Sequence, residues 1–304
     1  MSDRRYRQPL PLGGEDGLPF SKGLMARAAM AAGLPADRAY ELALAVEADL
    51  AARGRPATTL ERIEEVAIQT LGAEDGPAAM RRLRRYRDLY ELDLPIILLL
   101  GGATGTGKST VATDVAYRLG VTRVTSTDFV RQTMRAFFSE EFMPAIHHSS
   151  FAAGRAMAEE DGEGDSDAVL DGFLLQTREV LVGVRAAIDR VLEEGWSMVL
   201  EGVHLVPGML PKIEGALVVE CVLSIDDPEA HASHFWIRDS DSVGVRPYEK
   251  YLDAFDDIRQ IQTHILGRAR KHGVPVIENG NIEDAIGEVM ELVLAAAEPV
   301  AVGP

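Results

Sequence analysis

A strand–loop–helix pattern at residues 95–119 constrains the fold of this chain more than any other stretch. An apolar run, Ile96 to Leu100, ends in a glycine-rich turn, and Gly-Lys-Ser-Thr then opens a segment with apolar residues at helical spacing. The stretch from Gly102 to Ser109 matches the phosphate-loop pattern G-x-x-x-x-G-K-[ST]. Glycines let backbone N–H groups approach phosphate oxygens, and the dipole of the following helix favours the same anion. The pattern predicts binding of ATP or GTP.

The residues of this loop have separate expected roles. Lys108 is expected to reach the β- and γ-phosphates and to act in catalysis, whereas the Ser109 hydroxyl is expected to ligate Mg²⁺. The nucleotide-binding residues predicted from the pattern are Gly102, Thr104, Gly105, Thr106, Gly107, Lys108, Ser109 and Thr110.

From Pro95 onward, strand and helix patterns alternate. Such alternation predicts an α/β fold, a phosphate-loop NTPase kinase core in which helices cover both faces of a mostly parallel sheet. The expected strands are residues 96–100, 123–126, 197–201, 216–225 and 275–277, and residues 297–304 are expected to form a disordered tail. Ligands of such sheets bind at the carboxyl ends of the strands, so the residues that follow each strand are the candidates for function.

Residues 1–93 predict a small all-helical domain ahead of a kinase domain at 94–304. The expected helices run from a Ser21 cap to Gly33, over 36–53, from a capping box of Thr58 and Glu61 to Leu71, and over 77–92. The first 19 residues are either an arm or a short hairpin. The last of these helices carries five arginines between residues 81 and 87, which either contact a phosphate or form a solvated face; the solvated face is favoured.

Charge and composition exclude several classes of protein. The net charge of −17 argues against broad contact with nucleic acid, so an anionic substrate must be held by a local cluster of Lys and Arg. The single cysteine, Cys221, excludes an internal disulfide, and its apolar surroundings are typical of a buried residue. The apolar runs are too short to cross a bilayer and no signal-peptide pattern occurs, so we expect a cytoplasmic protein without a membrane partner.

The second expected strand leads into Asp128, beside the phosphate loop. Small-molecule phosphotransferases need a group there that orients a substrate hydroxyl and accepts its proton. Asp128 is predicted to take this catalytic and substrate-binding role; the alternative is that it only caps the next helix. Arg131 and Arg135 lie one turn apart on that helix, so both are predicted to bind an anionic substrate, with Arg131 favoured.

The third expected strand ends in Glu201-Gly202-Val203-His204. An acidic residue at this position can hold Mg²⁺ through water, and Glu201 is assigned to both the metal and the substrate. His204 is a candidate for substrate contact, but a lone histidine near a strand end is as readily structural.

A polar stretch after the fourth expected strand has arginines at both ends. Residues 238–250 resemble a lid that closes over the phosphates and excludes water, with Arg238 and Arg246 neutralising charge on the transferred phosphoryl group. The alternative is an exposed polar loop. Just before it, His231 and His234 have the spacing of neighbours on one helix face, without the context of a zinc motif.

Several motifs together resemble the 2-phosphoglycerate kinase family. They are residues 101–110, 126–131, 142–144, 147–150 and 200–208, supported by Gln176-Thr177-Arg178 and by residues 251–262. The run EGVHLVPG at 201–208 is considerably more specific than the phosphate loop alone. Residues 18–24 and the helices after them resemble the ATP-cone-like domain that precedes the kinase in that family. The resemblance implies phosphorylation of 2-phosphoglycerate to 2,3-bisphosphoglycerate with ATP and Mg²⁺, and it adds Arg178 to the substrate residues.

Other functions remain open at this point. The chain is alternatively a kinase for another small anionic hydroxy or phosphate compound, or an ATP-binding sensor without an acceptor. A kinase acting on nucleic-acid ends is disfavoured by the charge. We expect a small anionic phosphorylated substrate as partner, and homo-oligomers are possible.

Overall fold

The computed structural model describes residues 10–13, 19–154, 166–210, 212–242 and 248–301. The chain divides into two compact units. Unit 1 comprises residues 1–94, 117–120 and 290–304, and unit 2 comprises residues 95–116 and 121–289. The division after Leu94 lies one residue from the predicted boundary. However, two segments that we assigned to the kinase domain, 117–120 and 290–304, belong to the helical unit.

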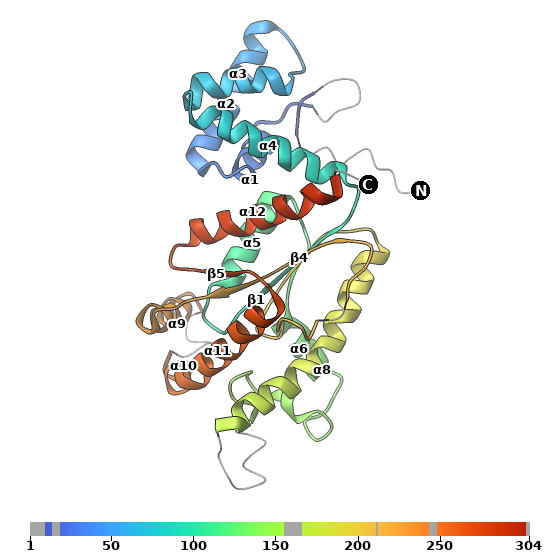
Figure 1. The fold of residues 1–304 in the computed structure, drawn as a ribbon, viewed down its shortest axis with the longest axis vertical. Helices are drawn as coiled ribbons and strands as arrows, with labels where there is room; N and C mark the ends of the chain where they lie inside the picture. The colour runs from blue at the N-terminus through green and yellow to red at the C-terminus, as the bar shows by residue number, and fades with distance from the viewer. Residues whose placement is uncertain (1–9, 14–18, 155–165, 211, 243–247, 302–304) are drawn as a thin grey trace. The chain divides into compact units, whose positions relative to one another are not determined.

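Unit 1 contains four consecutive helices (Figure 1): α1 (Lys22–Ala31), α2 (Ala36–Arg53), α3 (Leu60–Leu71) and α4 (Asp75–Glu91). Ser21 caps α1, as predicted, because its hydroxyl accepts a hydrogen bond from the backbone N–H of Leu24. The helices bury one apolar face each, which contributes Met25, Leu42, Ile63 and Leu83 to the core. Whether this unit functions as an ATP-cone-like domain stays a prediction.

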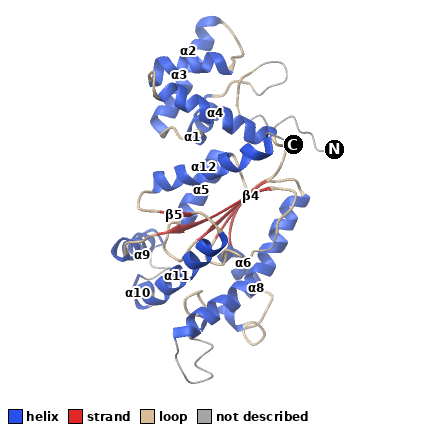
Figure 2. Cartoon of the chain, viewed as in Figure 1, coloured by secondary structure: helices blue, strands red, loops and turns tan. Residues whose placement is uncertain are grey.

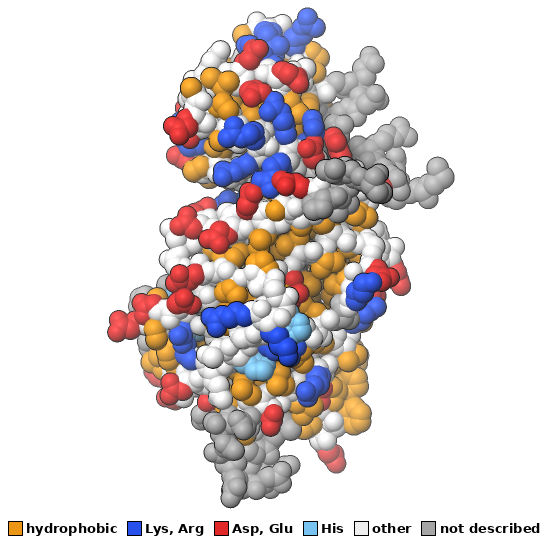
Figure 3. Space-filling view, viewed as in Figure 1, with side chains coloured by type: hydrophobic (Ala, Val, Ile, Leu, Met, Phe, Trp, Pro, Cys, Tyr) orange, Lys and Arg blue, Asp and Glu red, His pale blue; other side chains and the backbone are white. Residues whose placement is uncertain are grey.

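Two expectations for unit 1 have clear outcomes. The cap of α3 is Thr59 and not Thr58, since the Thr59 hydroxyl accepts from the N–H of Arg62 at 3.3 Å. The arginines of α4 meet carboxylates: Arg84 pairs with Glu64, and Arg85 pairs with two glutamates of the last helix. Basic and acidic side chains intermix over the surface of this unit (Figure 3), which supports the interpretation of the arginine run as a solvated face.

Unit 2 is built around a parallel sheet of five strands. The strands are β1 (Ile96–Gly101), β2 (Val124–Ser126), β3 (Met198–Glu201), β4 (Leu217–Ser224) and β5 (Val276–Glu278), in the spatial order β2-β3-β1-β4-β5. The helices that follow β1 along the chain are α5 (Lys108–Leu119), α6 (Thr127–Arg135), η2 (Pro144–His147), α8 (Ser166–Glu193), α9 (Pro228–Ser242), α10 (Tyr248–Asp253), α11 (Phe255–His272) and α12 (Ile282–Ala301). All of them belong to unit 2 except the end of α5, from Tyr117, and the part of α12 from Met290 onward, which belong to unit 1. All five predicted strands are present, and the α/β fold class is confirmed.

Helices lie on both faces of this sheet, with the strands fanned between them (Figure 2). On one face, α8 packs Val180, Val184 and Ile188 against Ile97 and Leu200 of β1 and β3. All six residues of β1 are buried, as the two-sided covering of a central parallel strand requires. The strand that leads into the phosphate loop is therefore packed on both sides.

Two helices extend beyond their expected ends. Helix α9 continues through Ser242, so Arg238 lies on a helix and not in the polar loop that we expected at 238–250. Helix α12 continues through Ala301, and Ala297 is buried, so residues 297–301 are not a disordered tail. Among the described residues, none of the helices has both the length and the apolar character that a membrane crossing requires.

Candidate active site

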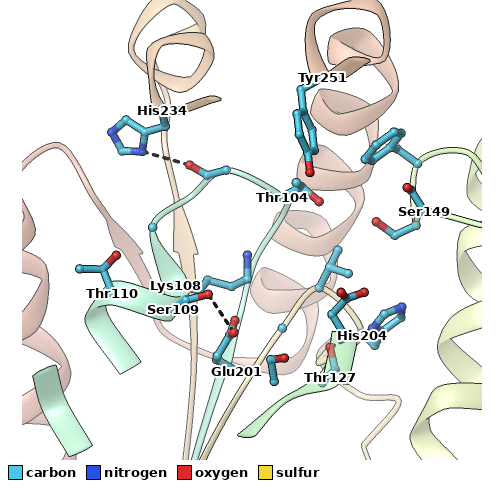
Figure 4. A pocket seen from close by; sticks show the side chains of 18 of the residues that line it. Thr104, Lys108, Ser109, Thr110, Thr127, Ser149, Glu201, His204, His234 and Tyr251 are labelled. Carbon is cyan, nitrogen blue, oxygen red and sulfur yellow. Dashed lines mark hydrogen bonds between the residues drawn. The ribbon is translucent and has the colours of Figure 1, made fainter. Parts of the chain in front are cut away.

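A pocket of about 650 Å³ lies in unit 2, where the carboxyl ends of the strands meet the phosphate loop (Figure 4). Its walls come from the loop itself, from the start of α6, from residues 149–151, from the end of β3 and from the turn after β5. The parallel register explains this convergence. Ser126, at the end of β2, is paired with Glu201, and Glu201 is paired with Leu100 of β1, so the three strands end at one level.

The phosphate loop has the backbone conformation that its glycines permit. Gly102, Gly105 and Gly107 have φ angles of +138°, +88° and +79°, which side-chain-bearing residues rarely adopt. Lys108 is buried, and its Nζ donates to the carbonyl of Ala103 at 2.5 Å. The ammonium group thus donates to the loop's own backbone. When a nucleotide binds, its phosphate oxygens would replace the Ala103 carbonyl as the acceptor.

Most of the predicted nucleotide-binding residues line the pocket: Thr104, Gly105, Gly107, Lys108, Ser109 and Thr110. The other two lie behind it. A Cβ on Gly102 would come within 2.4 Å of the carbonyl oxygen of Leu223, so this glycine is required by strand packing. The hydroxyl of the fully buried Thr106 donates to the carbonyl of Ala103 at 3.0 Å, which closes the loop.

Ser109 and Glu201, the two predicted metal residues, are in contact. The Ser109 hydroxyl donates to Oε1 of Glu201 at 2.9 Å, and Glu201 is 7% exposed at the end of β3. A hydroxyl and a carboxylate are the kind of oxygen ligands that Mg²⁺ takes beside nucleotide phosphates. The donor set therefore fits a magnesium ion at this edge of the pocket.

Asp128 lies at the first turn of α6 and lines the pocket. It is not the helix cap, because the hydroxyl of Ser126 accepts from the N–H of Phe129 at 3.0 Å. Its carboxylate is 57% exposed and pairs with Arg131 at 2.8 Å. Helix capping is thus performed by another residue, and the Asp128 carboxylate is left facing the pocket and solvent.

Arg131 is buried and holds several parts of the site together. Its Nε and Nη2 contact Asp128, and its Nη1 donates to the carbonyls of Ile146 and His148 at 2.7 and 2.8 Å. This guanidinium links the carboxylate to η2 and to the residue that follows it. It still lines the pocket, so an anionic substrate can reach it.

His204 belongs to a buried chain of hydrogen bonds. Its Nε2 lies 2.9 Å from Oε1 of Gln176, and its Nδ1 lies 2.8 Å from the hydroxyl of Thr127. The amide nitrogen of Gln176 donates to the carbonyls of Ala145 and His148, so its oxygen must accept from Nε2, and Nδ1 must accept from Thr127. Burial lowers the pKa of His204 to about 3, with the positive charge of Arg131 as a further cause. The neutral ring therefore positions Thr127. His204 also lines the pocket, so its contact with substrate stays a prediction.

Two further predicted residues, Arg135 and Arg178, are not among the residues that line the pocket. Arg135 is exposed and donates to Gln132 at 3.1 Å, one turn beyond the buried Arg131. Arg178 is exposed on α8, next to the buried Gln176 and Thr177. The side chain of Arg238 and the whole of Arg246 lie outside the described residues, and the predicted lid cannot be followed there.

Three residues that contact the phosphate loop were not among the predicted site residues. His231 and His234 of α9 contact the loop carbonyls of Thr104 and Gly105, and Asn279, which follows β5, contacts that of Thr106. The sequence held a signal for Asn279, since it is a polar residue at the carboxyl end of a strand. The two histidines had only their one-turn spacing, which does not specify a partner.

Comparison with curated proteins finds 2-phosphoglycerate kinases along almost the whole chain. The protein from Pyrococcus horikoshii is 35% identical over 274 residues, which cover 90% of this chain and 89% of that protein. The protein from Methanothermobacter thermautotrophicus is 37% identical over 275 residues, with the same coverage of 90% and 89%. That from Methanopyrus kandleri is 34% identical over 278 residues, which cover 91% and 84%.

No protein-family model matches the chain. Among solved structures, a shikimate kinase from Acinetobacter baumannii in complex with shikimate is similar with a TM-score of 0.37 and 17% identity, covering 66% of this chain and 94% of that one. A likeness this weak carries no argument for the site. The curated relatives show the family, because their identity of 34–37% extends over nine-tenths of the chain, and the chain therefore belongs to the 2-phosphoglycerate kinase family.

Proposed function

We propose that this protein transfers the γ-phosphoryl group of ATP to the free hydroxyl of 2-phosphoglycerate and releases 2,3-bisphosphoglycerate and ADP. The proposal rests on one observation: a single pocket, in a chain of this family, brings together a phosphate loop, an oxygen pair for Mg²⁺ and an ion-paired carboxylate. These are the groups that phosphoryl transfer to a hydroxyl needs.

Each residue of the pocket has a separate proposed role in phosphoryl transfer. Lys108 exchanges the Ala103 carbonyl for phosphate oxygens of the nucleotide and neutralises their charge. Ser109 and Glu201 would hold Mg²⁺, which would supply positive charge beside the nucleotide phosphates. Asp128 accepts the proton of the substrate hydroxyl while that oxygen bonds to the γ-phosphorus and the bond to the β-phosphate oxygen breaks. Arg131 holds the carboxylate in place and attracts the anionic acceptor.

The direct test is ATP consumption by the purified full chain with Mg²⁺ and 2-phosphoglycerate, 3-phosphoglycerate or no acceptor. We expect strong stimulation by 2-phosphoglycerate and a bisphosphoglycerate product. Stimulation by neither acid would overturn the acceptor assignment and favour another acceptor or a sensor.

Asp128→Asn separates catalysis from binding. The variant keeps the shape of the side chain and removes the base, so kcat is expected to fall roughly 10²- to 10⁴-fold, with ATP affinity unchanged. Asp114→Asn is a matched control, because Asp114 is not among the residues that line the pocket. An undiminished kcat in Asp128→Asn would remove Asp128 from the mechanism.

A further inference from the structure

Three successive carbonyl groups of the phosphate loop accept hydrogen bonds from side chains outside the loop. The carbonyl of Thr104 lies 2.8 Å from Nε2 of His231, and that of Gly105 lies 3.0 Å from Nδ1 of His234. Asn279 donates its Nδ2 hydrogen to the carbonyl of Thr106 at 3.0 Å. The bond from His234 is drawn in Figure 4. We call His231, His234 and Asn279 the carbonyl clamp.

The clamp determines where the loop's N–H groups point. In a planar trans peptide, the carbonyl and the N–H of the same peptide unit point in opposite directions. When the carbonyls of Thr104, Gly105 and Thr106 face the clamp, the N–H groups of Gly105, Thr106 and Gly107 must face away from it. Successive N–H groups turned to one side form the concave arrangement that binds anions.

The glycines let the clamp approach closely. A Cβ on Gly105 would lie 2.6 Å from the ring of Phe235 and 3.0 Å from Nε2 of His231. A Cβ on Gly107 would lie 2.3 Å from Nδ2 of Asn279. The loop and the clamp are therefore fitted to each other, and the lack of a side chain at these two positions is required by packing as well as by φ.

Two of the clamp residues, His231 and Asn279, are themselves held in place. The His231 ring packs against Phe235 and Phe255, with centroid separations of 5.4 and 5.5 Å. Burial lowers the pKa of His231 to about 4, so the ring is neutral near pH 7 and donates from Nε2. Asn279 is 5% exposed, and its own backbone N–H donates to the carbonyl of Ser224. The donors of His231 and Asn279 thus meet their acceptor carbonyls from fixed directions.

We propose that the carbonyl clamp consists of positioning residues that hold the phosphate loop in its anion-binding conformation before the nucleotide arrives. The proposal rests on the proposed function, since it assumes that the loop binds ATP. Preorganisation of this kind raises affinity because the loop loses less freedom on binding. The clamp acts through the loop backbone, so it should affect the nucleotide and leave the acceptor site alone.

The test compares variants that remove a donor with variants that keep it. His231→Gln retains an N–H near the position of Nε2 and His234→Asn retains one near Nδ1, whereas leucine at either position, or at Asn279, removes the donor at similar volume. His264→Leu is the control, because His264 is partly buried on α11 but does not line the pocket. The readouts are the Kd for Mg-ADP and Mg-ATP by calorimetry, the KM for the acceptor and the melting temperature.

Each leucine variant of the clamp is expected to weaken nucleotide binding roughly three- to tenfold, the equivalent of one hydrogen bond. The Gln and Asn variants should retain most of the wild-type affinity, and the KM for the acceptor should stay within twofold in all of them. Equal Kd values for the donor-free and donor-retaining variants would overturn the clamp. If the buried His231→Leu variant does not fold, the His234 and Asn279 variants decide the question. Failure of the wild-type protein to bind ATP would instead refute the proposed function.

Discussion

Thr127→Val tests whether the buried hydrogen bond to His204 stabilises the site. Thr127 is fully buried, and its hydroxyl lies 2.8 Å from Nδ1 of His204, whose other ring nitrogen is already engaged by Gln176. Valine has the same shape as threonine, so it preserves the contact with Gly202, where a Cβ would lie only 1.9 Å from the Thr127 oxygen. The substitution therefore removes one donor and leaves a buried acceptor unsatisfied.

The expected cost follows from that geometry. A buried polar atom left without its partner costs about 1–3 kcal/mol of unfolding free energy. For a domain of the size of unit 2, each kcal/mol lowers the melting temperature by roughly 2–4 °C. The measurement is urea unfolding followed by tryptophan fluorescence, which reports on unit 2 because both tryptophans of the chain, Trp196 and Trp236, lie in it.

A double-mutant cycle separates this hydrogen bond from other effects of the substitution. In a His204→Leu background the acceptor is absent, so the same Thr127→Val change should cost little, and the coupling energy between the two positions should reach about 1 kcal/mol. Thr127→Ser is the matched control, since it keeps the hydroxyl and loses one methyl group. A coupling energy near zero would refute the view that the Thr127–His204 bond stabilises the site.

Three further predictions concern the metal, the loop and pH. Ser109→Ala should raise the Mg²⁺ concentration needed for half-maximal activity by roughly 10- to 100-fold, whereas Ser109→Thr should not. If Ser109→Ala and the wild type need the same Mg²⁺ concentration, the hydroxyl is not a ligand. Gly105→Ala should lose ATP affinity because its Cβ meets Phe235 at 2.6 Å and its φ is +88°, and Phe235→Leu in the same chain should restore part of it in calorimetry. Folding lowers the pKa values of His204 and His231 from 6.5 to about 3 and about 4. At a pH between these values and 6.5, the unfolded chain therefore binds more protons than the folded chain. The contribution of each neutral ring to the unfolding free energy is fully present above pH 6.5. It falls by about 1.4 kcal/mol per pH unit for each histidine as the pH decreases toward 4. The unfolding free energy is measured in urea at pH 7, 6 and 5, and its dependence on pH should be weaker in His204→Leu than in the wild type. The same dependence in both would contradict the assignment to His204.

The sequence could locate the site because its signals are local. The phosphate loop needs a strand, a glycine-rich turn and a helix in direct succession, and all three lie within residues 95–119. Asp128 and Glu201 follow strands, and parallel strands end at one edge of the sheet, so a single topological rule was enough to bring them to the loop. Cys221 in the middle of β4 is buried, as its apolar neighbours indicated.

Contacts between distant segments could not be predicted in this way. One-turn spacing related Arg131 to Arg135 and His231 to His234, but spacing does not reveal which residue a helix turns toward the interior. The structure shows Arg131 buried and Arg135 exposed, and it places both histidines against a loop more than a hundred residues earlier in the chain.

The sequence by itself determined the fold class and the place of the phosphate loop, because short-range pattern and strand polarity are sufficient for these, and the resemblance of its motifs indicated the family. Only the tertiary structure decided that Thr59 and not Thr58 caps α3, that His204 is engaged on both ring nitrogens, and that side chains of α9 and of the turn after β5 contact the loop carbonyls. These depend on which donor comes within about 3 Å of which acceptor, a distance that is set when distant segments pack together.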